Sequence, residues 1–297
     1  MTELEDRLRS WTGHSSATEQ DKQDRTERMI REAIEAHEPF RGMSRRVYAK
    51  GSYANNTNVR SDSDVDVAVE CTDVLYWEEA TPGAHPPGTR YSGPWTPAKL
   101  RSELVAALRA KFGDAVDTSG TTAIQIHSTT ARVEADVVPC FEYRYYFSET
   151  SFREGAKVFK ADGSSLVNYS AQQLANGRRK NNQTSRAFKR TVRILKRLEN
   201  VMTDAGFHRE VPSFFVECLV YNCPDALFSA PTWTETVKGV LAHIYLSLEG
   251  PEPSEEEDRW VEVNGIKFLF HAAQKWTRQD GREFAEAGWK YLGLEGA

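Results

Sequence analysis

The 297-residue sequence contains no long hydrophobic run. No stretch of 18 or more apolar residues occurs, so no segment is predicted to cross a membrane as a helix. The opening residues, MTELEDRLRSWTGHSS, are charged from the third position and lack the apolar core of a secretory signal. We therefore expect a cytoplasmic protein with no membrane partner.

Cysteine and histidine are sparse and scattered. The four cysteines, at positions 71, 140, 218 and 223, form no CxxC pair and have no clustered histidine partner. Structural zinc sites normally need ligand pairs roughly two to four residues apart. Cys218 and Cys223 flank the apolar residues LVYN, which is more typical of buried thiols. The seven histidines match no ligand spacing, and we assign none of them a role.

A net charge of −5 means that the chain has no overall basic excess. Proteins that bind long nucleic acids normally carry such an excess or a basic face. The composition therefore favours small anionic substrates in a local pocket over a long nucleic acid. The basic segment 178–197 is a candidate for that pocket, because only neutral residues separate its cations. These are Arg178, Arg179, Lys180, Arg186, Lys189, Arg190, Arg193, Lys196 and Arg197.

Hydrophobic periodicity predicts a first half of alternating strands and helices and a second half that is mainly helical. The expected strands are 46–50, 64–70, 121–127 and 131–143. The expected helices are 20–37, 98–112, 184–203, 213–222, 234–248 and a closing stretch near 266–292. Proline and glycine predict a loop at 81–97, and a polar loop is expected between the last strand and residue 183.

The strongest chemical signal is GSYANNTNVRSDSDVDVAVE, residues 51–70. Gly51 and Ser52 are expected at the end of a strand. A backbone without Cβ can approach phosphate oxygens there, and a hydroxyl can donate to them. This pair is therefore a candidate phosphate-binding turn.

The strand that follows presents two aspartates on one face. In DVDVAVE the valines alternate with Asp64, Asp66 and Ala68, so the valines face one side and the aspartates the other. Carboxylates about 6.6 Å apart along a strand can flank two metal ions about 4 Å apart. Magnesium favours carboxylate and phosphate oxygens. Asp62 and Asp64 form a second DxD pattern. We prefer Asp64 with Asp66, because Asp62 lies before the alternating valines, in the preceding turn.

A third carboxylate is predicted from VEADVVPCF. Asp136 stands in an otherwise apolar strand, where an isolated aspartate is costly unless it is paired or metal-bound. Adjacent strands lie about 4.8 Å apart, so a neighbouring strand can bring Asp136 to the same ions as Asp64 and Asp66. A lone DxD is a common surface accident. The upstream Gly51-Ser52 and the downstream Asp136 favour a catalytic role for this DxD over a chance surface pattern.

Together these motifs resemble the polymerase-β-type nucleotidyltransferase superfamily. The blocks GSYANNTNVRSDSDVDV, ADVVPCFEYR, VNYSAQQLANGRRKNNQTSRAFKRTVRILK and VPSFFVECLVYNCPD narrow the resemblance. They are similar to the bacterial cyclic-oligonucleotide synthases related to cyclic GMP-AMP synthase, the CD-NTases, and most of all to clade E (CdnE). The blocks cover residues 51–223. The loop at 81–97 and the segment after 250 carry no recognisable family motif.

The resemblance implies an α+β fold with a polymerase-β-like nucleotidyltransferase core, a mixed sheet with helices, packed against a helical C-terminal lobe. The active site would lie in the cleft between them. The expected core, with an N-terminal helix, is residues 1–165. The expected helical lobe, contributing nucleotide-binding residues, is 166–297.

The resemblance also implies roles for single residues. Asp64, Asp66 and Asp136 would bind two Mg²⁺ ions, with Mn²⁺ as an alternative, and Gly51 and Ser52 would hold the donor triphosphate.

Four further residues are implied to contact the nucleotides. Lys196 would contact the β and γ phosphates, and Ser213 would open a helix whose N–H groups suit an anion. Phe214 would stack on the donor base, and Asn168 would read a uracil edge. Each has an ordinary structural alternative: a solvated basic helix face, a helix cap, a core aromatic and a turn residue, respectively.

The implied activity is synthesis of a cyclic dinucleotide second messenger from NTPs, with UTP and ATP as substrates and cyclic UMP-UMP or UMP-AMP as product. The implied role is CBASS antiphage signalling through a downstream effector. In some members a ubiquitin-ligase-like partner conjugates the C-terminus, and this chain ends in the small residues Gly296 and Ala297. The alternatives are a linear or larger cyclic product, an RNA, protein or small-molecule acceptor, and an inactive nucleotide sensor.

Overall fold

The computed structural model describes residues 2–13, 17–59, 64–86, 88 and 91–296. The chain forms two compact units. We call Ser15–Ala54 with Arg60–Ser170 the sheet unit, and Met1–His14 with Asn55–Val59 and Ala171–Ala297 the helical unit. The predicted boundary at 165/166 lies five residues before the observed one. In this division residues 2–13 and 55–59 belong to the helical unit, whereas the prediction places them in the core lobe.

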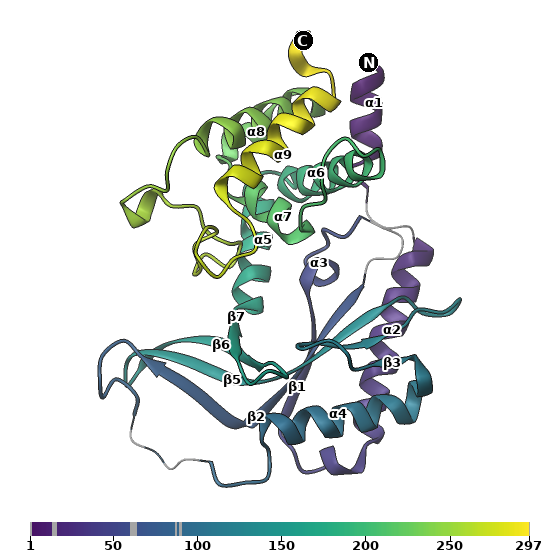
Figure 1. Cartoon of the computed structure of the whole chain (residues 1–297), viewed down its shortest axis with the longest axis vertical. Coiled ribbons are helices and arrows are strands. Elements are labelled where there is room, and N and C mark those ends of the chain that lie inside the picture. The colour runs from purple at the N-terminus through teal and green to yellow at the C-terminus, as the bar shows by residue number, and fades with distance from the viewer. Residues whose placement is uncertain (1, 14–16, 60–63, 87, 89–90, 297) are drawn as a thin grey trace. The chain divides into compact units, whose positions relative to one another are not determined.

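The sheet unit carries every named strand of the described chain (Figure 1). The strands are β1 Arg45–Lys50, β2 Val65–Glu79, β3 Val116–Asp117, β4 Ile124–Ile126, β5 Ala135–Ser148, β6 Ser151–Phe159 and β7 Ser165–Asn168. The helices are α2 Ala17–Ala36, α3 Gly51–Ala54, α4 Pro97–Phe112 and the short 3₁₀ turns Glu38–Phe40 and Gly113–Ala115.

The strands form one mixed sheet in the order β1-β2-β5-β4-β3, with β6 paired to β5 and β7 paired to β6. The central pair, β2 and β5, is parallel, and Asp66 lies directly opposite Asp136 in its register. The other pairings are antiparallel. The start of β5 pairs with β4 and its later part with β6.

Helices α2 and α4 pack on the valine face of the sheet. Val65, Val67 and Val69 are completely buried there, as are the predicted stripe residues Leu100 and Leu104 of α4. The opposite face, which carries Asp66, has a smaller apolar cluster formed by Ala68, Val138, Cys140, Ala156 and Val158. The predicted alternation of valines and aspartates on β2 is therefore confirmed. The face that carries Asp66 also has a small apolar cluster of its own.

The segment predicted as a polar loop before residue 183 contains β6, β7 and helix α5 (Ser170–Gln183) instead. The reason for the error is visible in the burial. Only Gly177 of α5 is buried, so this helix has no apolar stripe from which a period could be read. In β6 the buried positions alternate only at its C-terminal end.

The helical unit contains most of α5 and the remaining helices. These are α1 Glu3–Ser10, α6 Ala187–Asp204, α7 Ser213–Tyr221, α8 Trp233–Ser247, α9 Arg278–Tyr291 and the 3₁₀ turns Asp225–Ser229, Glu256–Asp258 and Leu294–Gly296. The predicted closing helix begins later than expected, because Thr277 and Asp280 form a capping box at the start of α9. Across the described residues, no helix is both long and apolar enough to traverse a bilayer.

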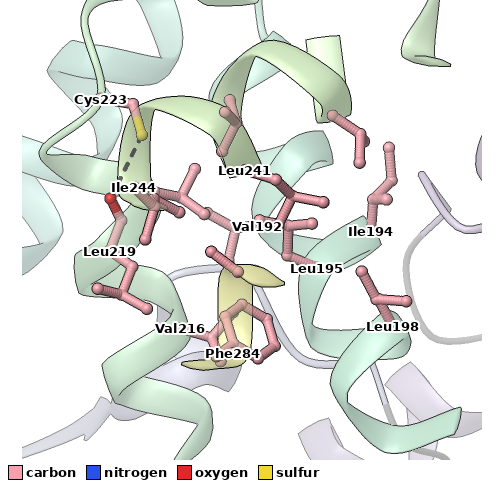
Figure 2. Close-up of a cluster of buried hydrophobic side chains, with 14 of the residues drawn as sticks. Val192, Ile194, Leu195, Leu198, Val216, Leu219, Cys223, Leu241, Ile244 and Phe284 are labelled. Carbon is pink, nitrogen blue, oxygen red and sulfur yellow. Dashed lines mark hydrogen bonds between the residues drawn. The ribbon is translucent and has the colours of Figure 1, made fainter. Parts of the chain in front are cut away.

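One apolar core holds the helical unit together (Figure 2). Val192 and Leu195 of α6 meet Val216 of α7, Leu241 of α8 and Phe284 of α9 there, all buried. Cys218 and Cys223 are buried free thiols, as predicted. Figure 2 also shows the Cys223 thiol directed at the carbonyl oxygen of Leu219.

The N-terminal helix is tied to this unit by Glu5. Its carboxylate accepts hydrogen bonds from the backbone N–H groups of Trp233 and Thr234, at 3.1 and 2.8 Å. It thereby serves as a cap for the first turn of α8. This contact explains why residues near the N-terminus leave the sheet unit, where the sequence prediction had placed them.

Candidate active site

A row of four polar side chains crosses the sheet unit from one strand to the next. Lys50 of β1 pairs with Asp66 of β2, Asp66 with Asp136 of β5, and Asp136 with Gln125 of β4. Directly paired residues in a sheet project from the same face. The register therefore brings the predicted site residues Asp66 and Asp136 together, with Lys50 at one end of the row and Gln125 at the other.

Two consecutive residues contact the Asp66 carboxylate. The Lys50 Nζ lies 3.0 Å from Oδ1. Gly51 has a φ of +70°, and a Cβ added to it would lie only 2.1 Å from Oδ2. Glycine is required at position 51 for two reasons. Residues with a Cβ disfavour a positive φ, and Asp66 occupies the space that a Cβ would take.

Asp136 carries an unsatisfied buried oxygen. Its Oδ1 has no hydrogen-bond partner, and a buried unpaired acceptor is costly. Burial and then the nearby charge of Asp66 raise the pKa of Asp136, while a hydrogen bond from Gln125 opposes the rise. Two carboxylates that destabilise one another, one with an unpartnered oxygen, form a site that a divalent cation would satisfy.

The third predicted ligand stands just outside the strand that carries Asp66. Asp64 is exposed and immediately precedes β2. Within the described ranges, no group of three or more histidine, cysteine or acidic side chains is arranged so that it could hold a metal ion. The register pairs Asp66 with Asp136, and the part of Asp64 in the three-carboxylate set stays a prediction. The alternative residue Asp62 lies outside the described residues.

Gly51 and Ser52 directly follow β1, as predicted, and open the short helix α3 rather than a turn. Ser52 is half-buried. The sequence prediction identified their place at the strand end but not the contact between Gly51 and Asp66, which depends on strand register.

Asn168 lies on the same face of the sheet as the two aspartates. It ends β7 and pairs with Ala156 of β6. Ala156 and Leu166 belong to the apolar cluster that contains Ala68, two residues after Asp66 on β2. Residues two apart in a strand share a face, so Asn168 and Asp66 project to one side of the sheet. Asn168 is thus a strand residue, and the alternative of an ordinary turn residue is wrong.

Lys196 is buried in an ion pair. Its side chain is 2% exposed, and its Nζ donates to Glu217 at 2.9 Å and to Thr57 at 3.2 Å. The alternative of a solvated helix face is therefore wrong, and the contact of Lys196 with a triphosphate stays a prediction.

Other cations of the basic segment are also engaged internally. Arg193 donates to the carbonyl oxygens of Thr12 and Asn56, each at 2.7 Å. Lys180 pairs with Asp225 at 2.6 Å. These two side chains therefore serve the packing of the helical unit, whereas Arg178, Arg179, Arg186 and Arg190 are exposed, and the anion pocket in segment 178–197 stays a prediction.

Ser213 and Phe214 stand at the first turn of α7. Ser213 is exposed and is the first helical residue, while Pro212 takes the cap position without a side-chain hydrogen bond. The expectation of an opening serine is confirmed, and the alternative of a serine cap is wrong. Phe214 is half-buried, with its ring 6.3 Å from Trp276 in an edge-on arrangement.

Comparison with known proteins identifies the family. A model of the cGAS/DncV-like nucleotidyltransferase C-terminal helical domain matches residues 175–293. The cyclic dipyrimidine nucleotide synthase CdnE of Legionella pneumophila is 33% identical over 295 residues, which cover 97% of each chain. The chain belongs to the CD-NTase family. The predicted family and nucleotidyltransferase class are thereby confirmed.

Two further CD-NTases extend the comparison. The cyclic dipurine nucleotide synthase of Elizabethkingia meningoseptica is also 33% identical, over 99% of this chain and 100% of the relative. The solved Rhodothermus marinus CdnE c-UMP-AMP synthase, with Apcpp and Upnpp, has a TM-score of 0.85 and 28% identity over 99% of this chain and 97% of its own. The predicted fold class is confirmed. Overall identity does not choose between pyrimidine and purine products, because both kinds of relative are equally similar.

Proposed function

We propose that this CD-NTase joins nucleoside triphosphates into a cyclic dinucleotide that contains a pyrimidine, cyclic UMP-UMP or cyclic UMP-AMP. The observation that carries the transferase activity is the register pair Asp66 and Asp136 with its unsatisfied buried oxygen. The observation that favours a pyrimidine is Asn168 on the same face of the sheet. Relatives named for dipyrimidine and UMP-AMP products agree with this choice.

The chemistry rests on the carboxylates. Asp66 and Asp136, joined by the exposed Asp64, would hold two Mg²⁺ ions or Mn²⁺ in their place. Such ions supply charge neutralisation at the reacting phosphate and lower the pKa of the attacking hydroxyl. In each transfer the 3′-oxygen of one nucleotide loses its proton and bonds to the α-phosphorus of another. The bond to pyrophosphate breaks, and a second transfer closes the ring.

Five further predicted residues would position the substrates. The Ser52 hydroxyl, at the start of α3, and Gly51 beside it would contact the donor triphosphate. The exposed Ser213 at the first turn of α7 offers a hydroxyl and free backbone N–H groups to an anion. The half-buried Phe214 would present part of its ring to a base. Asn168 would pair through its amide with adjacent donor and acceptor atoms of uracil.

Product mass tests the proposal directly. The protein is incubated with all four labelled NTPs and Mg²⁺, treated with phosphatase, and the resistant products are identified by mass spectrometry. We expect a uridine-containing cyclic dinucleotide that Asp66→Ala abolishes. Exclusively linear products, larger rings or a nucleotidylated acceptor would contradict the cyclic-dinucleotide proposal. Binding of NTPs without turnover would indicate an inactive sensor.

The signalling context forms part of the same proposal. The product would activate a downstream effector in CBASS antiphage defence. A ubiquitin-ligase-like partner would conjugate the C-terminal carboxylate, but Ala297 lies outside the described residues. Mass spectrometry of the protein after co-expression with its neighbouring genes tests conjugation. A C-terminus of unmodified mass under these conditions would contradict it.

A further inference from the structure

The residue before Gly51 places a positive charge directly on the candidate metal site. The Lys50 Nζ reaches Oδ1 of Asp66 at 3.0 Å, while Oδ2 occupies the space that a Cβ of Gly51 would take. The Lys50 side chain is 17% exposed, so the ammonium is partly removed from solvent. Two consecutive backbone positions therefore fix both oxygens of one carboxylate.

The charges in the four-residue row are unequal. Asp66 and Asp136 contribute two negative charges, Lys50 one positive charge, and Gln125 none. Before any metal arrives, the row thus contains a cation of its own, next to the carboxylate oxygens that a divalent ion would use.

We propose that Lys50 is a built-in counter-ion of the metal site, which holds Asp66 in position without metal and weakens metal binding until a nucleoside triphosphate is present. The ammonium competes for Oδ1 and repels a divalent ion nearby. A triphosphate brings several negative charges that outweigh this repulsion. Metal and nucleotide would therefore bind with positive coupling, and Lys50 would contribute to it. This inference rests on the proposed function, because it takes Asp66 and Asp136 as metal ligands.

Lys50 differs from an ordinary lysine ion pair of the same unit. Lys157 of β6 pairs with Glu78 at 3.2 Å, and its side chain is 19% exposed, close to the value for Lys50. Lys157 lies opposite Phe141 of the valine-face core, whereas Lys50 lies opposite Asp66. The two lysines match in side-chain exposure, and each pairs with one carboxylate, but they project from different faces of the sheet. Lys157 is therefore a suitable control for the loss of a lysine as such.

The test measures Mn²⁺ binding to metal-free protein without nucleotide, by the electron paramagnetic resonance signal of free Mn²⁺. We expect Lys50→Met to bind Mn²⁺ about tenfold more tightly than the wild type, since a positive charge near the ion is removed. Lys50→Arg should bind Mn²⁺ as the wild type does, and so should Lys157→Met. Adding a non-hydrolysable NTP analogue should tighten Mn²⁺ binding less in Lys50→Met than in the wild type.

Mn²⁺ affinity of Lys50→Met equal to or below that of the wild type would overturn the inference, and so would undetectable binding in both. Lys50→Gln, which keeps a hydrogen-bond donor beside Asp66 without the charge, replaces Lys50→Met if circular dichroism shows that the latter is misfolded. The readout is independent of turnover. A wild type that binds Mn²⁺ as expected but forms no cyclic dinucleotide would contradict the proposed function alone.

Discussion

Lys196 and Glu217 form an ion pair of 2.9 Å in which the two side chains are only 2% and 1% exposed. The Glu217 carboxylate also accepts hydrogen bonds from Thr57, at 2.6 Å, and from Asn55. Burial alone would raise the pKa of Glu217, but the charge of Lys196 and these donors lower it. The cluster joins α6 and α7 to the short segment 55–59 and thereby assigns that segment to the helical unit.

Removing one partner of this pair should be strongly destabilising. Lys196→Met leaves the Glu217 carboxylate buried without its cation, and such losses cost about 3–5 kcal/mol of unfolding free energy. Urea unfolding followed by circular dichroism measures the change. The double variant Lys196→Met with Glu217→Gln should cost less than the sum of the single variants, because no uncompensated charge remains. A loss below about 1 kcal/mol in Lys196→Met would show that the pair is accessible to water.

Acid should weaken the fold through the same carboxylate. The pKa of Glu217 in the folded protein is below its ordinary value of 4.5. The group therefore contributes stability above pH 4.5, and this contribution is lost as the pH falls through the lowered folded-state pKa. We expect the free energy of unfolding to fall below pH 4.5 less steeply in Glu217→Gln than in the wild type. Equal slopes, measured by urea unfolding at several pH values, would assign the acid sensitivity to other carboxylates.

Gly51 should be irreplaceable for activity, although not for folding. An alanine Cβ would lie 2.1 Å from Oδ2 of Asp66 and would displace that carboxylate. Gly51→Ala should lower the rate of product formation at least about 100-fold, since small displacements of catalytic groups have effects of this size. Gly83 has a φ of +86° with nothing within 4 Å of an added Cβ, so Gly83→Ala isolates the backbone strain. Gly83→Ala should lose about 1 kcal/mol of stability and keep its activity, whereas Gly51→Ala should lose more, because its Cβ also displaces Asp66.

The ionised Asp136 carboxylate should destabilise the folded protein, although the same carboxylate is needed for activity. Its raised pKa means that the ionised carboxylate destabilises the folded state above that pKa. Asp136→Asn should therefore increase the melting temperature of metal-free protein at neutral pH, on the order of 2 °C, and abolish nucleotidyl transfer. Differential scanning calorimetry and the product assay measure the two effects. A lower melting temperature in Asp136→Asn would mean that the carboxylate stabilises the fold through a partner that the amide cannot replace.

Local patterns were sufficient to predict the central strands and the aspartate pair. The valine alternation of β2 is a property of consecutive residues, and the apolar run around Asp136 already required a partner for its charge. Register could not be predicted in the same way. Lys50 is 16 residues from Asp66 along the chain, and their contact depends on how β1 pairs with β2.

The burial of Lys196 could not be predicted for the same reason. Its partners Glu217 and Thr57 are 21 and 139 residues away in the sequence. A basic run suggests solvent or phosphate when it is considered alone, because lysine is rarely buried. Only the tertiary fold brings the Glu217 carboxylate next to Lys196 and so compensates the cost of burying the ammonium group. Helix α5 was missed for another reason, since a helix with a single buried residue has no hydrophobic period.

Asn168 supplies the sharpest test of base choice. If its amide pairs with uracil, Asn168→Ala should lower the share of UMP in products from equimolar NTPs by about tenfold relative to purines, the effect of losing one or two hydrogen bonds. Mass spectrometry of the products measures that share. Asn176, half-buried in α5, donates to the carbonyl oxygen of Val263, so Asn176→Ala is a matched loss of an amide within the helical unit. An unchanged UMP share in Asn168→Ala would show that residues other than Asn168 recognise uracil. A uniform loss of all products would instead indicate that Asn168 positions the acceptor regardless of its base.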